Sequence, residues 1–215
     1  MIRLLKKEIK LAMHPTAPAF LLLSAMLLIP NYPYYVVFFY TSLAVFFTCL
    51  SGRENQDVLF TLLLPVKRAD LVKARFLFVV LLEAAQMLTA AIFAVLRNTL
   101  MPAPNAAGMD ANLTLFAMAL VMMGIFHIVF FPMYYRNVQH VGKAFVAGST
   151  AVFAFIILAE ASVHAIPFVR DVLDTPDPAF MGIKGVVMGI GFFLYLALTA
   201  WAYRRAKAFF ERQSL

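Results

Sequence analysis

Six apolar segments dominate the pattern of the chain. They cover residues 14–30, 35–52, 75–97, 113–134, 144–163 and 183–203. A helix needs about 20 apolar residues to cross the hydrocarbon core of a bilayer. Lipid offers no hydrogen bonds to the backbone, so runs of this length form helices. The alternation that a membrane barrel requires is missing. The pattern predicts an all-α membrane protein with six transmembrane helices in one domain, residues 1–215.

The start of the chain departs from this regular pattern. Three prolines (Pro15, Pro18 and Pro30) crowd the first span, which we expect to be short and kinked. Before it, residues 1–13 place apolar and basic side chains on opposite helical faces. This spacing predicts an amphipathic helix that lies in the membrane interface. It either serves only as a topology anchor or forms an elbow that leads into the first span.

Composition supports lipid as the main solvent of the chain. Hydrophobic residues make up 63% of the sequence and charged residues only 13%, against about 25% charged in a typical soluble domain. The net charge of +7 could indicate a nucleic-acid partner. However, the basic residues cluster beside the apolar spans, as topology determinants do, so no nucleic-acid partner is expected.

The distribution of Lys and Arg predicts the orientation in the membrane. The N-terminal segment, the loops at 53–75 and 135–143, and the C-terminal tail together hold fifteen of these residues. The other side holds three: Arg97, Arg170 and Lys184. Under the positive-inside rule, this bias places both termini in the cytoplasm.

Motifs for catalysis are absent from the sequence. It contains no G-x-x-x-x-G-K-[ST] loop, no H-E-x-x-H and no G-x-S-x-G. The four histidines are too dispersed to predict a metal site, and the single cysteine, Cys49, cannot form an internal disulfide. We therefore expect neither an enzyme nor a metal or cofactor bound by this chain.

The stretch "ENQDVLFTLLLPVKRADLVKARF", residues 54–76, is charged and proline-broken between two apolar spans. Residues 54–64 predict a short helix with Val58, Leu59, Leu62 and Leu63 on one apolar face. Pro65 ends it, and a second helix begins near Arg68. Such a segment either lies in the lipid headgroups or docks into a partner.

In this stretch the chain resembles the ABC-2 type permeases, the membrane subunits of ATP-binding-cassette transporters. The basic N-terminal helix and the six spans extend the resemblance over the whole chain. The turn "LLPVKR" at 63–68 carries Lys67 where that family often has serine, a departure that weakens the N-cap of the second helix.

The resemblance implies that residues 54–68 form the coupling segment, which sits in a groove of a separate ATPase. Glu54, Gln56 and Asp57 would meet polar groups there. Residues Glu54 to Leu64 would lie in the groove with Phe60 as the apolar anchor, and Pro65 and Arg68 would set the turn. ATP and Mg²⁺ would be bound by that partner. A second permease subunit is also implied, either a second copy or a related chain.

Ionisable residues within the spans are costly and are candidates for function. Glu83 lies eight residues after Arg75, and His127 lies eight residues before Tyr135, so both sit about 12 Å from the inner face. Their side chains can therefore meet, and Gln86, one turn from Glu83, could join them. The group is either a buried network that locks spans three and four or a polar, proton-sensitive point on a substrate path.

Toward the other side, Glu160 and His164 lie four residues apart on one face of the fifth span. Lys184 begins the sixth span at a similar level. We interpret these three residues as a polar cluster at the outer rim rather than as a binding site.

These observations favour a permease subunit of a bacterial ABC exporter in the cytoplasmic membrane, moving a hydrophobic or amphipathic peptide, drug or lipid. Two alternatives stay open: a non-transporting membrane scaffold or regulatory subunit, and a proton-coupled secondary transporter that uses Glu83.

Overall fold

The computed structural model describes residues 1–101 and 103–212, and all regular structure in this part of the chain is helical. The elements are α1 (Ile2–Lys7), a π-helical turn η1 (Glu8–Ala12), α2 (Thr16–Leu22), a 3₁₀ segment η2 (Leu23–Leu28), α3 (Tyr35–Glu54), α4 (Asp57–Leu62), α5 (Arg68–Leu100), α6 (Leu113–Arg136), α7 (Val141–Ala165), the short turns η3 (Val169–Leu173) and η4 (Pro178–Phe180), and α8 (Met181–Glu211).

Five of the six predicted spans are present as long single helices. Among the described residues, five helices are long and apolar enough to cross a membrane: α3, α5, α6, α7 and α8. The first span is shorter and changes from α2 to the 3₁₀ segment η2, and it is bent by 83° from the preceding α1 and η1. Counted with that bent pair, the spans reach six. The prolines near this span explain its shortness, because proline removes a backbone donor and interrupts the helical ladder.

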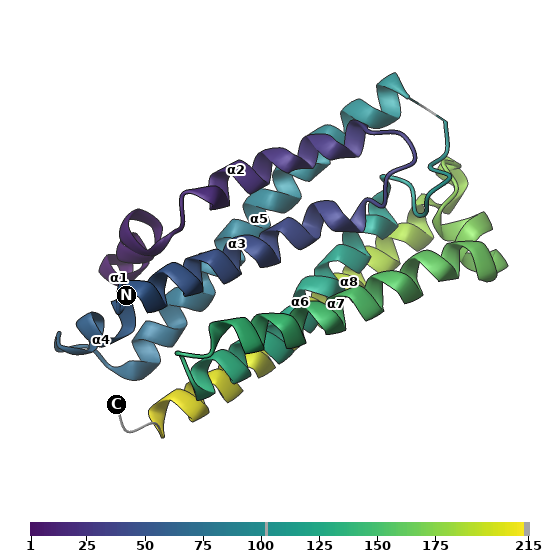
Figure 1. Cartoon of the computed structure of the whole chain (residues 1–215). Helices are drawn as coiled ribbons and strands as arrows, with labels where there is room; N and C mark the ends of the chain where they lie inside the picture. Colours follow the sequence, from purple (N-terminus) through teal and green to yellow (C-terminus); the bar gives the residue numbers. More distant parts are fainter. Residues whose placement is uncertain (102, 213–215) are drawn as a thin grey trace.

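Two sets of helices pack side by side. Figure 1 shows α2, α3 and α5 in one layer and α6, α7 and α8 in the other. Within the second layer, α6 and α8 approach closely at Gly191, where an added Cβ would stand 2.7 Å from the carbonyl oxygen of Ala117. Small residues permit such close packing of membrane helices. The layers meet where α3 contacts α6 and α7, and where α5 contacts α8.

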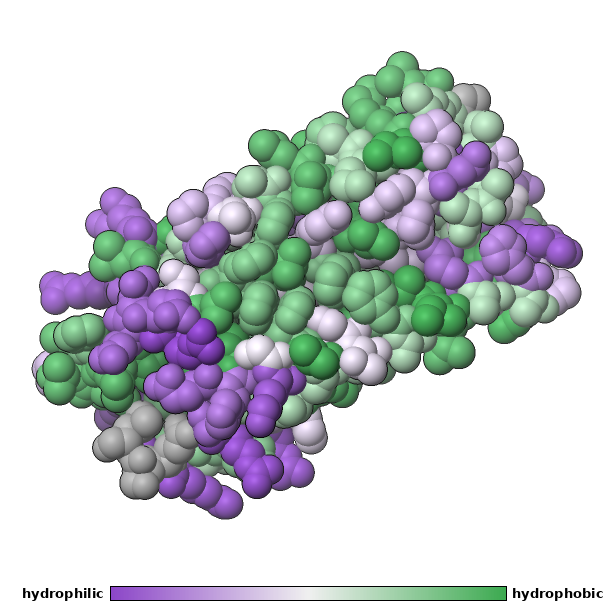
Figure 2. Space-filling view, viewed as in Figure 1, coloured by the Kyte–Doolittle hydropathy of each residue, from purple (hydrophilic) through white to green (hydrophobic). Residues whose placement is uncertain are grey.

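The two ends of the molecule differ. The N-terminus, α4 and the C-terminal end of α8 lie at one end, which we call the basic end (Figure 1). The loops around Asn105 and Asp174 lie at the other, which we call the loop end. Figure 2 shows hydrophobic side chains across the middle of this face, between two more hydrophilic ends. This banding is what a multi-pass membrane protein requires.

Candidate functional site

Residues 54–68, the predicted coupling segment, differ from their predicted form at the start. Helix α3 continues through Glu54, so this residue ends a span rather than opening a new helix. Gln56 then adopts a left-handed backbone conformation (φ 50°), and α4 runs only from Asp57 to Leu62. The left-handed residue turns the chain sharply, which explains why the acidic residues do not form one continuous helix with α4. After Pro65, α5 begins at Arg68, and its N-cap Lys67 makes no side-chain cap bond, as expected.

The apolar residues of this segment do not share one face, which corrects the sequence-based prediction. Val58 is buried against the rest of the chain, and Leu62 packs on the core. By contrast, Leu59, Phe60, Leu63 and Leu64 are exposed, Phe60 to 64%. We call these four residues the docking patch. Together with Gln56 and Arg68, three of them line a hollow of about 370 Å³.

Asp57 faces into the chain rather than outward, a second correction. Its carboxylate lies 2.6 Å from Lys7 Nζ and 3.1 Å from Arg75 Nη2. Arg75 Nε lies 2.5 Å from Glu8 Oε2, and Lys7 Nζ lies 3.1 Å from Glu8 Oε1. Arg75 and Glu8 are each only 1% exposed. This four-residue ion cluster joins the N-terminal helix, α4 and α5 at the basic end.

The remaining residues of the segment have more ordinary surroundings. Glu54 is exposed and pairs with its neighbour Arg53. Arg68 donates a hydrogen bond of 3.2 Å to the carbonyl oxygen of Phe210, and its guanidinium lies 5.9 Å from the centre of that ring. Arg68 therefore fastens the start of α5 to the end of α8. Pro65 lies exposed in the turn between α4 and α5.

A second polar cluster lies in the middle of the spans. Here the structure brings Glu83 and His127 together: His127 Nε2 lies 2.9 Å from Glu83 Oε1. The hydroxyl of Tyr195 donates to Glu83 Oε2 over 2.6 Å, and His127 Nδ1 shares a hydrogen bond of 2.9 Å with Thr199 Oγ1. Glu83, His127 and Tyr195 are buried. This mid-span cluster pins α5, α6 and α8 to one another.

Gln86 does not join the mid-span cluster. It is fully buried, and its side-chain amide donates to Ser24 Oγ over 2.9 Å. Ser24 in turn lies 3.1 Å from Thr89 Oγ1. Three residues along a helix turn a side chain by about 300° rather than a full circle, which is enough to direct Gln86 toward η2 while Glu83 points toward α6 and α8. Gln86 therefore fixes the first span to α5.

The contacts of the mid-span cluster predict coupled stability. Glu83→Leu leaves His127 and the Tyr195 hydroxyl without their acceptor, so we expect a loss of about 1–3 kcal/mol in the free energy of unfolding. His127→Leu should cost a similar amount, and the double variant should cost less than the sum. Gln86→Leu is the matched control, and its effect should add to that of His127→Leu. Equilibrium unfolding in detergent measures these free energies. Strict additivity of Glu83→Leu and His127→Leu would contradict a contact between the two side chains.

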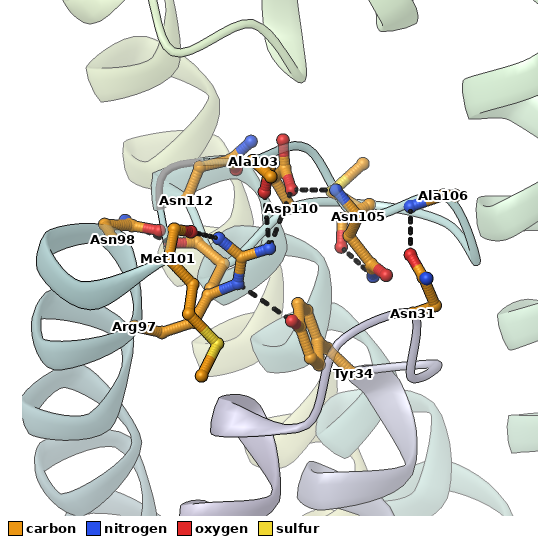
Figure 3. A network of polar contacts seen from close by, with 12 residues as sticks. Asn31, Tyr34, Arg97, Asn98, Met101, Ala103, Asn105, Ala106, Asp110 and Asn112 are labelled. Carbon is orange, nitrogen blue, oxygen red and sulfur yellow. Dashed lines mark hydrogen bonds and ion pairs between the residues drawn. The ribbon is translucent and has the colours of Figure 1, made fainter.

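A third polar group occupies the loop end, centred on Arg97 (Figure 3). Arg97 is buried and donates to the Tyr34 hydroxyl over 2.9 Å, to the carbonyl oxygen of Ala103 over 2.7 Å, and to that of Met101. The nearest Asp110 oxygen lies 3.9 Å away. These contacts tie the loop between α5 and α6 to the start of α3.

The three residues predicted to form the outer-rim cluster divide between two places. Glu160 Oε2 accepts a hydrogen bond of 2.9 Å from the backbone of Met109, and His164 is near enough to act on it electrostatically. Lys184 is buried instead and donates to the carbonyl oxygen of Thr175. It lines a separate pocket with Arg97, Asp110 and Asp174. The depth of Lys184 in the span was predictable from the sequence, but the direction of its side chain was not.

Asp174 gives the loop end a pH dependence. Burial, and to a lesser degree the neighbouring charges of Asp110 and Glu160, raises its pKa to about 7. Because the folded pKa lies above the ordinary value of 3.8, its contribution to stability is complete below pH ~4 and is lost as pH rises through about 7. Asp174→Asn keeps an acceptor for Asp110 N and Asn112 Nδ2, which bond Asp174 at 2.7 and 3.0 Å.

We therefore expect Asp174→Asn to be more stable than the parent chain above pH 7 and to flatten the pH dependence between about pH 4 and 7. Asp171→Asn is the control, because the pKa of this exposed residue is lowered by Arg170. Thermal unfolding across this pH range measures the effect, and an unchanged slope in Asp174→Asn would contradict it.

Sequence reasoning missed several residues of these clusters. Glu8 is the single acid among four basic residues of the N-terminal helix, which was a usable signal of pairing. Tyr195 and Thr199 lie four apart, and therefore on one face of α8. Among the described residues, no group of three His, Cys, Asp or Glu side chains is arranged to hold a metal ion.

One protein-family model matches nearly the whole chain. Residues 3–202 match the family model described as ABC-2 family transporter protein. No curated protein and no solved structure matches the chain.

Proposed function

Because the chain belongs to the ABC-2 transporter family and is a membrane permease of an ABC transporter, we propose that it is the permease subunit of a bacterial exporter. ATP would be hydrolysed by a separate ATPase, which would also bind Mg²⁺. A second permease subunit, identical or related, would complete the transporter. The apolar spans support a hydrophobic or amphipathic substrate, such as a peptide, a drug or a lipid.

One observation carries this proposal: α4 combines an exposed docking patch with a buried ionic connection to the spans. Phe60, Leu63 and Leu64 are available to a partner. On its inner side, Asp57 binds both Lys7 and Arg75. A protein that merely rested α4 on lipid would gain from the apolar patch but would not need the ion pairs. A protein that must transmit motion needs both.

The proposed path of motion follows these contacts. Movement of the ATPase displaces α4, and the ion cluster passes this displacement to α1 through Glu8 and Lys7 and to α5 through Arg75. Helix α5 extends without interruption from Arg68 to Leu100, so it also carries the mid-span cluster and Arg97. Changes of access between the two sides would then arise as rigid movements of packed helices.

The test of this function is reconstitution with an ATPase. The chain should co-purify with an ABC ATPase, and vesicles containing both should move an amphipathic substrate only when ATP is hydrolysed. Binding of the ATPase without transport would support a scaffold or regulatory subunit instead. Transport that needs no ATP and is abolished by Glu83→Gln would support a proton-coupled transporter.

Orientation is part of the proposal: the basic end faces the cytoplasm. In a Cys49→Ala background, an impermeant thiol reagent added outside should label Ala106→Cys and Asp177→Cys, which lie in the loops of the opposite end. It should leave Asn55→Cys and Gln139→Cys unlabelled until the membrane is opened. These four positions are exposed, so access decides the result. Labelling of Asn55→Cys from outside would reverse the assignment.

A further inference from the structure

A pocket of about 590 Å³ lies between α5, α6 and α8 at the loop end. Its volume falls within the range of about 300–1,000 Å³ found for small-molecule sites. Neither Glu83 nor His127 lines it, so it is separate from the mid-span cluster. Its position also separates it from the docking patch, which belongs to the basic end.

The lining of the pocket changes with depth. Near the loops it is polar, with Arg97, Lys184, Asp110 and Asp174. Toward the middle of the spans it is apolar, with Met87, Leu88, Met188 and Phe116. From Met87 to Asn98 it follows α5 for about 16 Å. Methionine side chains adapt to ligands of varied shape. This order suits a molecule with a polar head at the loops and an apolar tail along α5.

The pocket also borders the lipid. Leu88 and Val95 line it and are each 68% exposed on a membrane-spanning helix. A tail can therefore enter sideways from the bilayer, without passing through water.

The charged groups at the head of the pocket favour an anion. Lys184 donates to a backbone carbonyl, that of Thr175, and Arg97 donates to two others. Arg97 also forms a long ion pair of 3.9 Å with Asp110, whereas among the described residues no carboxylate forms an ion pair with Lys184. A phosphate or carboxylate headgroup would supply the charged acceptor that Lys184 lacks and a closer one for Arg97.

The two acids at the rim already accept hydrogen bonds from neighbouring groups. Asp174 accepts hydrogen bonds from Asp110 N and Asn112 Nδ2. Asp110 accepts a hydrogen bond of 2.6 Å from Asn105 N (Figure 3). Burial also raises the pKa of both carboxyl groups, that of Asp174 to about 7, which reduces the negative charge of Asp174 near neutral pH. The rim therefore keeps its two cations and loses part of its repulsion toward an anion.

We propose that this pocket binds an amphiphile with an anionic headgroup, the head held by Lys184 and Arg97 and the tail lying along α5. The proposal goes beyond the transport function, because it requires only the fold, and its test measures binding alone. Two sources share this chemistry: an anionic phospholipid of the bilayer and a free single-chain amphiphile such as a fatty acid.

The experiment uses the full chain in nanodiscs of phosphatidylcholine and three photoactivatable probes. These are a diazirine fatty acid, the neutral alcohol of the same length, and a diazirine phosphatidylglycerol. Mass spectrometry of the labelled peptides should place the anionic probes on residues 87–98 and 181–188, with the alcohol labelling them much less. Labelling by the phospholipid alone identifies a resident lipid, and labelling by the fatty acid alone identifies a free amphiphile.

Two variants test the head and the tail separately. Lys184→Gln, which keeps a donor for Thr175, should weaken the anionic probes about tenfold and leave the alcohol unchanged. Lys143→Gln, at an exposed position of α7, is its control.

Ala91→Phe fills the pocket from an exposed position on α5 and should remove labelling by all probes, whereas Ala154→Phe on α7 should not. Equal labelling by the alcohol and the fatty acid, or full labelling of Ala91→Phe, would overturn the proposal.

Discussion

Arg75→Met is expected to lower the free energy of unfolding by about 3–5 kcal/mol, because it leaves the carboxylates of Glu8 and Asp57 without their buried partner. Arg75 lies 2.5 Å from Glu8 and 3.1 Å from Asp57, and it is almost completely enclosed. Lys7 remains close to both carboxylates, but its single positive charge cannot balance two negative charges. The measurement is equilibrium unfolding of the purified chain in detergent.

Lys73→Met is the matched control for this variant. Lys73 lies on the same helix two residues earlier but is exposed, so its loss should change the free energy by less than about 0.5 kcal/mol. When Arg75→Met is combined with Glu8→Gln, the loss in free energy of unfolding should be less than the sum of the two single losses, since either change alone already removes the Arg75–Glu8 interaction. If Arg75→Met were as mild as Lys73→Met, the ion cluster would not hold the basic end together.

The order of the apolar helices was predictable because it depends on local properties. A run of about 20 apolar residues must form a helix in lipid, and Pro65 must interrupt the backbone ladder. The meeting of Glu83 and His127 was predictable for a related reason. Both spans are anchored at the same interface, and a helix rises about 1.5 Å per residue, so equal distances along the sequence place both residues at one depth.

Direction around the helix axis was harder to predict than depth. Lys184 lies at the expected level but points into the pocket beside Arg97 rather than toward Glu160. Gln86 turns toward Ser24. Which side of a helix faces which neighbour depends on the packing of several helices, and these spans are too uniformly apolar to reveal it. The left-handed conformation of Gln56 was also hidden, because glutamine has no special preference for it.

The internal pairing of Asp57 changes how the coupling proposal should be tested. A lysine at position 57 would stand beside Lys7 and Arg75, so that variant would damage the fold itself and give no information about a partner. The docking patch offers a cleaner test, because its side chains point away from the chain. Phe60 is the best choice, as a large aromatic side chain that is 64% exposed.

Phe60→Ala is expected to weaken binding of the ATPase by about 2 kcal/mol, roughly thirtyfold in affinity, because a buried aromatic anchor of an interface typically costs that much when it is truncated. The stability of the chain alone should not change, since the ring is exposed in the absence of the partner. Affinity is measured by titrating the purified ATPase against the chain in nanodiscs, with unfolding measured in parallel.

Phe193→Ala is the matched control, because Phe193 is also highly exposed, at 71%, but lies on the membrane-spanning part of α8. It should bind the ATPase like the parent chain. Glu54→Lys adds a second probe at the edge of the patch, since Glu54 is exposed and pairs only locally with Arg53 among the contacts of the described residues. It should reduce affinity where the partner's groove is basic. If Phe60→Ala kept full ATPase binding and transport, the docking patch would rest on lipid, and motion would have to enter the spans elsewhere.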